Sequence, residues 1–447
     1  MTFEAFKEEV FAQAKAKGFS DYELFYSAED GFSVRVFKGE ISEYKNSSTE
    51  GVGFRGTYEG KMGYAYSENM NIHCITPLLE NAIGNATIIE DEDMEKLYTG
   101  DDKYPEVNNY NPALNDIDAA QKIQWALAMD KYVTDLDPRI KMADYCTVAT
   151  TESRVAIANS HGLHLSKKMN FATAYVIVRA EENGETKSGT EIWIGRDFKD
   201  FDYKAVGQKA VDKAISYLNA EAIPTGEYPI IFNDETARDV FGVFSSIFMA
   251  EKGQKGFSML TKEKLGEVIA ASNITIRDDG VTDLNLFSSP FDAEGVATQN
   301  KAIIENGVLK QLLYNTKSAE KDGVQSTGNA SKVGYGGAIE TSCTNFYLVP
   351  GKKSYDELVT GLEKGLIITE LAGLHSGTND VSGDFSFSAD GFLVEGGKII
   401  KPVEQITIAG NFYEMLKNID EVGSDLRFVK KIGMPSILTS GLRVAGL

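Results

Sequence analysis

Histidine is the side chain best suited to moving protons near neutral pH, and the 447-residue sequence contains only four histidines. One of them, His375, lies in a segment rich in glycine and polar residues that runs on to Asp384. Polar loops on a β scaffold often contact ligands, so we expect peptide-binding or cavity-lining side chains in this loop. The candidates are His375, Ser376, Asn379 and Asp384. The alternative is a structured turn in which the Asn and Asp side chains bond to their own backbone.

The residues that usually bind metal ions are scattered through the sequence. His161 and His164 are three residues apart, but they flank a glycine turn and no acidic or cysteine third ligand accompanies them. The cysteines, Cys74, Cys146 and Cys343, show no C-x-x-C spacing, so neither a zinc knuckle nor a disulfide framework is predicted. We therefore expect no bound metal and no other cofactor.

Other catalytic patterns are weak or missing. The sequence has no G-x-S-x-G elbow for a nucleophilic serine and no Walker A loop for a nucleotide. The glycine cluster at 334–337 lacks the third glycine of a G-x-G-x-x-G loop, which favours a simple turn. Pairing of carboxylates in the second half of the chain is the alternative for Asp283, Asp292, Glu294 and Asp384, but we interpret them as surface acids because acidic residues are abundant.

The balance of charge excludes one large class of ligand. The chain has 45 basic and 66 acidic residues and a formal net charge of -21, and its densest basic run is only Arg427, Lys430 and Lys431. An acidic surface repels phosphate backbones, so we expect no direct contact with nucleic acid. The N-terminal residues favour an amphipathic helix over a secretory signal, and no segment is suited to spanning a membrane. We expect a cytoplasmic protein.

The elements that must position these residues follow from hydrophobic periodicity and from turn residues. In the first half, short antiparallel strands lie between residues 22 and 66, with turns at Gly31, Gly39 and Gly60, and further strands fill 144–194 with a hairpin at Asn183-Gly184. The helices expected in this half, besides the N-terminal one, are 75–89, 117–136 and 203–222. A long surface loop is expected over 98–115.

A segment with two prolines and a glycine, 223–229, marks the expected domain boundary. We expect two domains, 1–222 and 223–447. The second begins with a strand and a helix capped by Asn233 or Asp234, and then becomes mostly strands, with turn signals at 306–307, 390–391 and 396–397. The predicted class is α+β, with an antiparallel sheet and flanking helices in each domain and a strand-rich C-terminal domain.

A series of short strings in the second half resembles the C-terminal domain of the TldD/PmbA family, known as modulators of DNA gyrase and as U62-type peptidases. Each string alone is only a turn, but their order and spacing make the resemblance specific. The strings are SPFDAEGVAT at 289–298, IENGVL at 304–309, YNT at 314–316, STGNA at 326–330, TNFYL at 344–348, GDFS at 383–386, EGGK at 395–398 and IAGNF at 408–412.

The resemblance implies a cytoplasmic protein that dimerises with itself or pairs with a sister subunit around an enclosed cavity. Complexes of this family trim unfolded peptides. Their catalytic branch carries H-E-x-x-x-H on the first helix of the C-terminal domain, with a cysteine near the C-terminus as a third zinc ligand. The zinc ion activates water and polarises the scissile carbonyl, while the glutamate moves protons.

This sequence departs from the catalytic branch at each of those points. Alignment on Lys255-Gly256 puts Phe241, Gly242 and Ser246 where the two histidines and the glutamate would stand, and no cysteine follows Cys343. The resemblance is therefore to the PmbA-like (TldE) branch without the metal motif. The same helix is expected to bury its phenylalanines and to present small residues, Gly242, Ser245 and Ser246, on its opposite side. These either border a peptide-sized cavity or pack closely against a neighbouring strand.

Three functions remain open from the sequence. The first is a metal-free PmbA/TldE-like subunit that binds unfolded peptide by strand addition and works with a TldD-like catalytic partner. The second is a metal-independent peptide hydrolase built around His375 and Asp384. The third is a non-enzymatic, homodimeric peptide-binding protein.

Overall fold

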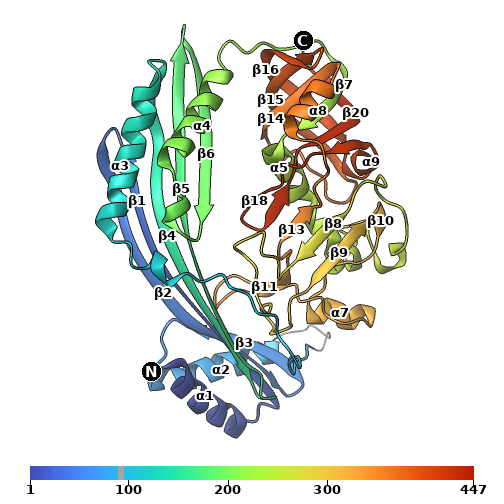
Figure 1. Ribbon diagram of the computed structural model, residues 1–447. Coiled ribbons are helices and arrows are strands. Elements are labelled where there is room, and N and C mark those ends of the chain that lie inside the picture. Colours follow the sequence, from blue (N-terminus) through green and yellow to red (C-terminus); the bar gives the residue numbers. More distant parts are fainter. Residues whose placement is uncertain (89–94) are drawn as a thin grey trace.

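The computed structural model describes residues 1–88 and 95–447, and the last residue of the helix expected over 75–89 lies outside this part of the chain. The first half is built on one long antiparallel sheet of six strands, in the order β3-β2-β1-β4-β5-β6. Its strands are β1 (Asp21–Phe37), β2 (Glu40–Tyr58), β3 (Lys61–Ser67), β4 (Ile140–Asn159), β5 (His164–Glu182) and β6 (Glu185–Gly195). The sheet runs the height of the molecule beside the C-terminal half (Figure 1).

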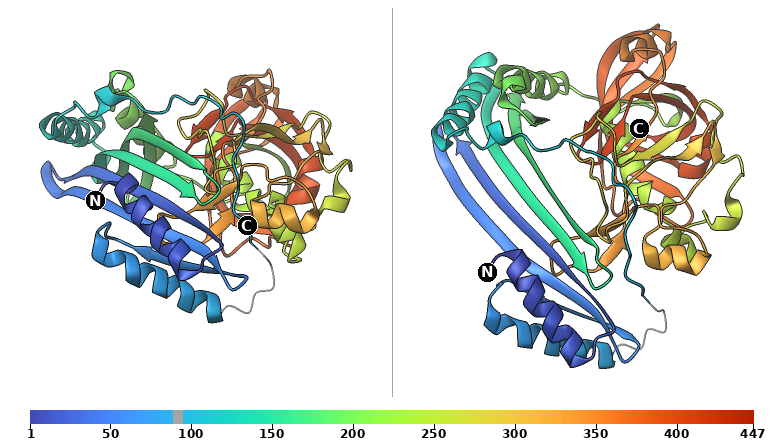
Figure 2. Two further views of the ribbon diagram at one scale, coloured as in Figure 1. Left: turned by 90° about the horizontal axis from the view of Figure 1, so that it is seen from below. Right: turned by 60° about the horizontal axis from the view of Figure 1, so that its bottom comes forward.

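Four helices accompany this sheet, two near each end (Figures 1 and 2). They are α1 (Phe3–Lys17), α2 (Ile72–Ile88), α3 (Ala119–Leu136) and α4 (Tyr203–Ser216). Side chains alternate across a strand, and in β1 Leu24 packs with α1 and α2 while Val34 packs with α3 and α4. Phe25, which points to the other face, packs against Phe291 and Ala293 of the C-terminal half. One face of the sheet therefore carries helices and the other meets the C-terminal half.

Residues 95–118, which we call the connector, follow the seam between the two halves before α3 begins. Tyr104 donates a hydrogen bond from its hydroxyl to the carbonyl of Gly295 at 2.8 Å. Asp101 accepts one from the backbone N–H of Ala297 at 2.8 Å. The connector thus ties the long sheet to the C-terminal half by specific bonds rather than by apolar contact alone.

The C-terminal half contains two larger sheets and a short hairpin. In the first sheet, in the order β16-β15-β14-β7-β20-β17, β16 also pairs with β20, which closes five strands into a ring. Its strands are β7 (Gly226–Phe232), β14 (Lys364–Ala372), β15 (Asp384–Glu395), β16 (Lys398–Asn411), β17 (Ile419–Val422) and β20 (Ile437–Ala445). The second sheet and the hairpin comprise β8 (Ile276–Asp279), β9 (Asn300–Glu305), β10 (Val308–Leu309), β13 (Phe346–Leu348), β18 (Arg427–Val429) and β19 (Ile432–Met434), with β11 (Ala330–Lys332) and β12 (Ile339–Thr341).

Helix α5 (Asp234–Phe244) lies in the core between these sheets. Asn233 begins it, accepting a hydrogen bond from the backbone N–H of Thr236 at 2.9 Å, as an N-cap should. Phe244 is fully buried and stacks on Phe412 at a ring separation of 4.5 Å. The shorter helices of this half are α6 (Ala250–Gln254), α7 (Thr316–Asp322), α8 (Tyr355–Gly361) and α9 (Phe412–Lys417).

Two expected turns are wrong, and in both cases the glycine serves close packing. Gly31 lies inside the 17-residue strand β1, where a Cβ atom would come 2.8 Å from Ser47 Oγ of β2. Gly391 lies inside β15, where a Cβ would come 1.9 Å from the carbonyl oxygen of Ile367. Glycine permits such approaches because it has no side chain. By contrast, the hairpin at Asn183-Gly184 is confirmed, with φ values of 52° and 85°.

The α+β class with antiparallel sheets and a strand-rich C-terminal half is confirmed, with two parallel pairings, β7 with β14 and β13 with β19. The helix expected over 203–222 ends earlier, at Ser216, and the division into domains at residue 222 stays a prediction. None of the helices in the described part of the chain is long and apolar enough to cross a membrane.

Candidate functional site

The solvent side of α5 borders a hollow of about 650 Å³, which we call the α5 cavity. Gly242 and Ser245 lie on this side, as the helical periodicity predicts, while Phe241 and Phe244 point into the core. A Cβ atom at Gly242 would meet only Ile432 Cδ1, at 3.4 Å. The remaining wall comes from Arg238, Asp239, Val243, Met249, Phe287, Ser342, Cys343, Leu374, Val429, Lys430, Lys431 and Ile432.

Most of this wall is apolar, and its one ion pair joins neighbours on α5. Arg238 Nη2 lies 3.6 Å from Asp239 Oδ1, and burial raises the pKa of Asp239 while the Arg238 charge opposes that shift. Burial also raises the pKa of the Cys343 thiol above its usual range, so Cys343 is not a thiolate nucleophile at neutral pH. The cavity offers space and apolar surface more than acid–base chemistry.

The donors that a zinc ion requires do not come together on α5. Phe241 is fully buried with its ring 5.3 Å from that of Phe412, Gly242 has no side chain, and Ser246 Oγ lies 3.4 Å from Asp380 Oδ2. Across residues 1–88 and 95–447 no group of three or more His, Cys, Asp or Glu side chains is arranged to hold a metal ion. A catalytic zinc ion needs three such protein ligands and an open position, so the residues at this place do not fit one.

The loop that contains His375 is a hydrogen-bonded turn beside the cavity, and it contributes Leu374 to the wall. Asn379 Oδ1 accepts hydrogen bonds from the backbone N–H groups of Val381 and Ser382, at 3.0 and 3.1 Å. Asp384 accepts from Ser382 Oγ at 2.8 Å, and its bonds with Asn411 and Ser382 lower its pKa.

His375 and Ser376 are exposed on the same loop, and neither lines the α5 cavity. The hydroxyl of Ser376 donates to the carbonyl of Gly373 at 3.2 Å, within the loop itself. Of the seven candidates from the sequence, the structure thus brings Gly242 and Ser245 to one cavity. Ser246 lies in the 3-10 turn Ser245–Phe248 that follows α5 and contacts Asp380 of the loop, and the four loop candidates lie outside the cavity.

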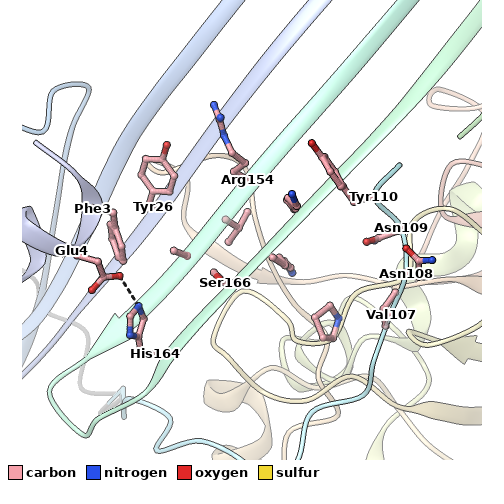
Figure 3. A pocket seen from close by; sticks show the side chains of 15 residues that line it. Phe3, Glu4, Tyr26, Val107, Asn108, Asn109, Tyr110, Arg154, His164 and Ser166 are labelled. Carbon is pink, nitrogen blue, oxygen red and sulfur yellow. Dashed lines mark ion pairs between the residues drawn. The ribbon is translucent and has the colours of Figure 1, made fainter. Parts of the chain in front are cut away.

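His161 and His164, which the sequence does not favour as metal ligands, are also separated. His161 Nε2 lies 2.9 Å from Asp21 Oδ1, whereas His164 Nε2 lies 2.9 Å from Glu4 Oε1 of helix α1. Figure 3 shows His164 and Glu4 at one side of a hollow of about 740 Å³ on the long sheet, which we call the sheet pocket. The two histidines hold different carboxylates and do not converge.

A third hollow, of about 280 Å³, lies at the seam between the two halves and links the other two. It shares Phe287 and Lys431 with the α5 cavity, and it shares Asn109 of the connector and Lys167 with the sheet pocket. We call it the lysine pocket, after the four lysines on its wall, Lys167, Lys168, Lys332 and Lys431. The lysine pocket is thus a neighbour of both other hollows.

A buried ionic cluster supports this seam. Arg55 of β2 lies with Nε 2.8 Å from Glu23 Oε1 and Nη1 3.7 Å from Glu294 Oε1, and all three side chains are buried. Asp292 accepts hydrogen bonds from backbone N–H groups, including that of Ala330 at 2.9 Å, while burial and the nearby Glu294 raise its pKa. The interpretation of Asp292 and Glu294 as surface acids is therefore wrong. Glu294 joins the C-terminal half to the long sheet through Arg55, whereas Asp292 orders the backbone around it within the C-terminal half.

Sequence reasoning missed the lysine pocket, although one signal for it was present. Ser289 and Ala293, which line the pocket, belong to the string at 289–298, and Ser331 and Lys332 directly follow the string at 326–330. Two of the strings that carry the family resemblance thus border the lysine pocket.

Family models match most of the chain in three consecutive parts. Residues 22–86 match domain 1 of the PmbA/TldA metallopeptidases, 112–218 match the central domain, and 225–446 match the C-terminal domain. The chain belongs to the PmbA/TldD metallopeptidase family.

Relatives match over nearly the whole length. Metalloprotease PmbA of Escherichia coli O157:H7 is 29% identical over 442 residues, which cover 96% of this chain and 94% of the relative. A Thermotoga maritima protein described as a candidate modulator of a DNA gyrase has a solved structure with a TM-score of 0.92 and 31% identity, covering 99% and 100% of the two chains. TldE from Thermococcus kodakarensis shares the fold, with a TM-score of 0.91, 24% identity and coverage of 99% and 100%.

Proposed function

We propose that this chain is the metal-free subunit of a TldD-type metallopeptidase system, in which it binds unfolded peptide while a TldD-like partner supplies the catalytic metal. One observation carries the proposal: α5 keeps an open cavity of about 650 Å³ beside Gly242 and Ser245 but presents no set of metal ligands. Space without donors suits binding better than hydrolysis. The name of the E. coli relative, metalloprotease PmbA, supports a role in proteolysis.

Strand β18 is the sheet edge best placed to receive an extended peptide. It ends the order β10-β9-β8-β13-β19-β18, and its partner on the inner side is β19. Val429 at its end lines the α5 cavity together with Lys430. A peptide added along β18 would gain main-chain hydrogen bonds from the strand while its side chains entered the cavity. We propose a cytoplasmic setting for this system because the three cysteines of the chain are all free thiols.

The test combines this protein with a TldD-type homologue that carries the H-E-x-x-x-H motif. We expect the purified chain alone to hold no stoichiometric zinc and to leave unfolded peptides intact. The mixture should form a complex of defined mass by light scattering and cleave the peptides in a chelator-sensitive manner. The proposal would be contradicted if the two proteins did not associate and the mixture showed no change in cleavage. It would also be contradicted by tightly held zinc in the C-terminal half of this chain.

The two other functions make different predictions in the same experiment. A hydrolase built on His375 would show chelator-insensitive cleavage by this chain alone, lost in His375→Ala. The bonds of the loop do not favour it, because Asp384 is held by Ser382 and Asn411. A self-sufficient binding protein would form a homodimer that binds peptide and ignores the TldD-type homologue.

A further inference from the structure

The wall of the lysine pocket has a charge opposite to that of the molecule as a whole. The chain carries a formal net charge of -21, yet four lysines and no aspartate or glutamate line this pocket within the described part of the chain. The lysines are far apart in the sequence. Lys167 and Lys168 come from β5, Lys332 from β11 and Lys431 from the turn between β18 and β19. Folding therefore assembles a local concentration of positive charge where the two halves meet.

The protein itself leaves much of this charge unneutralised. Lys167 Nζ donates to Ser289 Oγ and to the carbonyl of Phe291, both at 2.6 Å, so its acceptors are neutral groups. Lys332 Nζ lies 5.0 Å from the ring centroid of Phe25, and Lys168 Nζ lies 3.7 Å from that of Tyr110. No ion pair within 4.0 Å joins any of the four lysines to a carboxylate of the described residues. Aromatic faces stabilise ammonium groups, but they do not cancel the charge.

Two of these lysines have lowered pKa values, so the pocket disfavours their charged forms. Burial lowers the pKa of Lys167 to about 8, with Lys431 adding to the shift and Asp292 opposing it. Burial lowers the pKa of Lys332 to about 8 as well, with Arg55 adding to the shift and Glu23 opposing it. A desolvated cation among other cations gains more from an incoming anion than an exposed one does. The pocket is thus prepared for a negative ligand.

We propose that the lysine pocket binds a carboxylate of the peptide, so that this subunit favours unfolded peptides with an acidic side chain or a free C-terminus at that position. The inference rests on the proposed function and deepens it by naming a substrate class. Its volume of about 280 Å³ suits one side chain, and Phe287 and Lys431 connect it to the α5 cavity beside β18. A nucleic acid is disfavoured because a long polyanion would meet the acidic remainder of the surface.

The experiment compares labelled unfolded peptides that differ only in charge. One pair exchanges a single Glu for Gln, and a second pair exchanges the free C-terminal carboxylate for an amide. Affinity is measured by fluorescence anisotropy on the full chain, alone and in complex with the TldD-type homologue. We expect at least one acidic member to bind about tenfold more tightly than its neutral partner, the effect of one charge-assisted hydrogen bond. The pair that shows the preference identifies whether a side chain or the C-terminus enters the pocket.

Two lysine variants test whether the preference for acidic peptides arises in the lysine pocket. Lys332→Gln and Lys431→Gln should each reduce the charge preference to less than about threefold. Lys398→Gln is the matched control, because Lys398 is exposed and lies outside the three hollows, so the same charge is removed without touching the pocket. Lys431 is also exposed, so its substitution should leave the fold intact even if that of Lys332 does not.

The outcomes separate this inference from the proposed function. Equal affinity for both members of both pairs would overturn the carboxylate inference and leave peptide binding standing. Failure of every peptide to bind, alone and in the complex, would overturn both. A single-stranded oligonucleotide that binds the wild type more tightly than the acidic peptides, and loses affinity in Lys431→Gln, would assign the pocket to phosphate instead and overturn the inference.

Discussion

The α5 cavity and the lysine pocket share Phe287 and Lys431, yet they offer opposite surroundings to a ligand. The cavity is wide and mostly apolar, and its one carboxylate, Asp239, is paired with Arg238. The pocket is less than half as large, and four lysines stand among the apolar and neutral polar residues of its wall. Under the proposed function, the cavity would accept peptide side chains with little discrimination, and the pocket would discriminate by charge.

The largest effect should come from removing the ionic cluster under the lysine pocket. Arg55→Met leaves Glu23 and Glu294 buried without their cation, so we expect the free energy of unfolding to fall by about 3–5 kcal/mol. Urea denaturation measures it. Arg443→Met is the matched control, because Arg443 is exposed and a surface substitution should change stability by about 0.5 kcal/mol or less. A loss below about 1 kcal/mol for Arg55→Met would show that the seam does not depend on this cluster.

The comparison also shows what could be predicted from sequence. That Gly242 and Ser245 lie on one side could be predicted because helical periodicity is local and extends to the residue that caps α5. The lysine pocket could not be predicted in this way, because Lys167, Lys332 and Lys431 come together only when the two halves of the chain pack against each other. Local patterns likewise predicted the strands and the Asn183-Gly184 hairpin.

Glycine was the least reliable sequence signal, because it marks sharp turns and close backbone contacts equally. Gly39 lies in the turn between β1 and β2, with a φ of 77°. Gly31 lies in the middle of β1, where the place of a Cβ is next to the side-chain hydroxyl of Ser47 on the neighbouring strand. Which role a glycine takes depends on a neighbour that the local sequence does not reveal.

Raising the pH should weaken the binding of a carboxylate in the lysine pocket and leave binding in the α5 cavity unchanged. Lys167 and Lys332 both have a pKa of about 8, so they lose their protons as the pH rises from 7 to 9. The charges that face them are Asp292 and Lys431 for Lys167, and Arg55 and Glu23 for Lys332.

Only the protonated lysines attract a carboxylate, so affinity for the favoured acidic peptide should fall toward that of its neutral partner, by up to about tenfold, over this range. Anisotropy titrations at pH 7, 8 and 9 measure it, with the neutral member of the pair as the control. The neutral peptide should bind equally at all three values, and a parallel decline in both peptides would refute the assignment to these lysines.

Filling the α5 cavity should weaken the binding of acidic and neutral peptides alike. Gly242→Leu places a branched side chain in the peptide-sized space, so both acidic and neutral peptides should lose roughly fivefold to tenfold in affinity, about 1–1.4 kcal/mol. Gly242→Ala is the matched control, since its Cβ would meet only Ile432 Cδ1 at 3.4 Å. Replacing a helical glycine with alanine should raise the free energy of unfolding by about 0.5–1 kcal/mol. Unchanged peptide affinity in Gly242→Leu would exclude the cavity from the binding path.

The smallest effect should come from substitutions in the loop that contains His375. His375 is exposed, and among the hydrogen bonds of the described residues none joins it to Asp384, so His375→Ala should alter stability by less than about 0.5 kcal/mol. Asp384→Ala removes an acceptor for Ser382 and Asn411 and should cost about 1 kcal/mol by opening the turn. Cleavage by the mixture with the TldD-type homologue should stay within about twofold in His375→Ala, because nothing in the loop lines the cavity except Leu374. A loss of cleavage without a loss of stability would place the catalytic site in this exposed loop of the chain rather than in the partner.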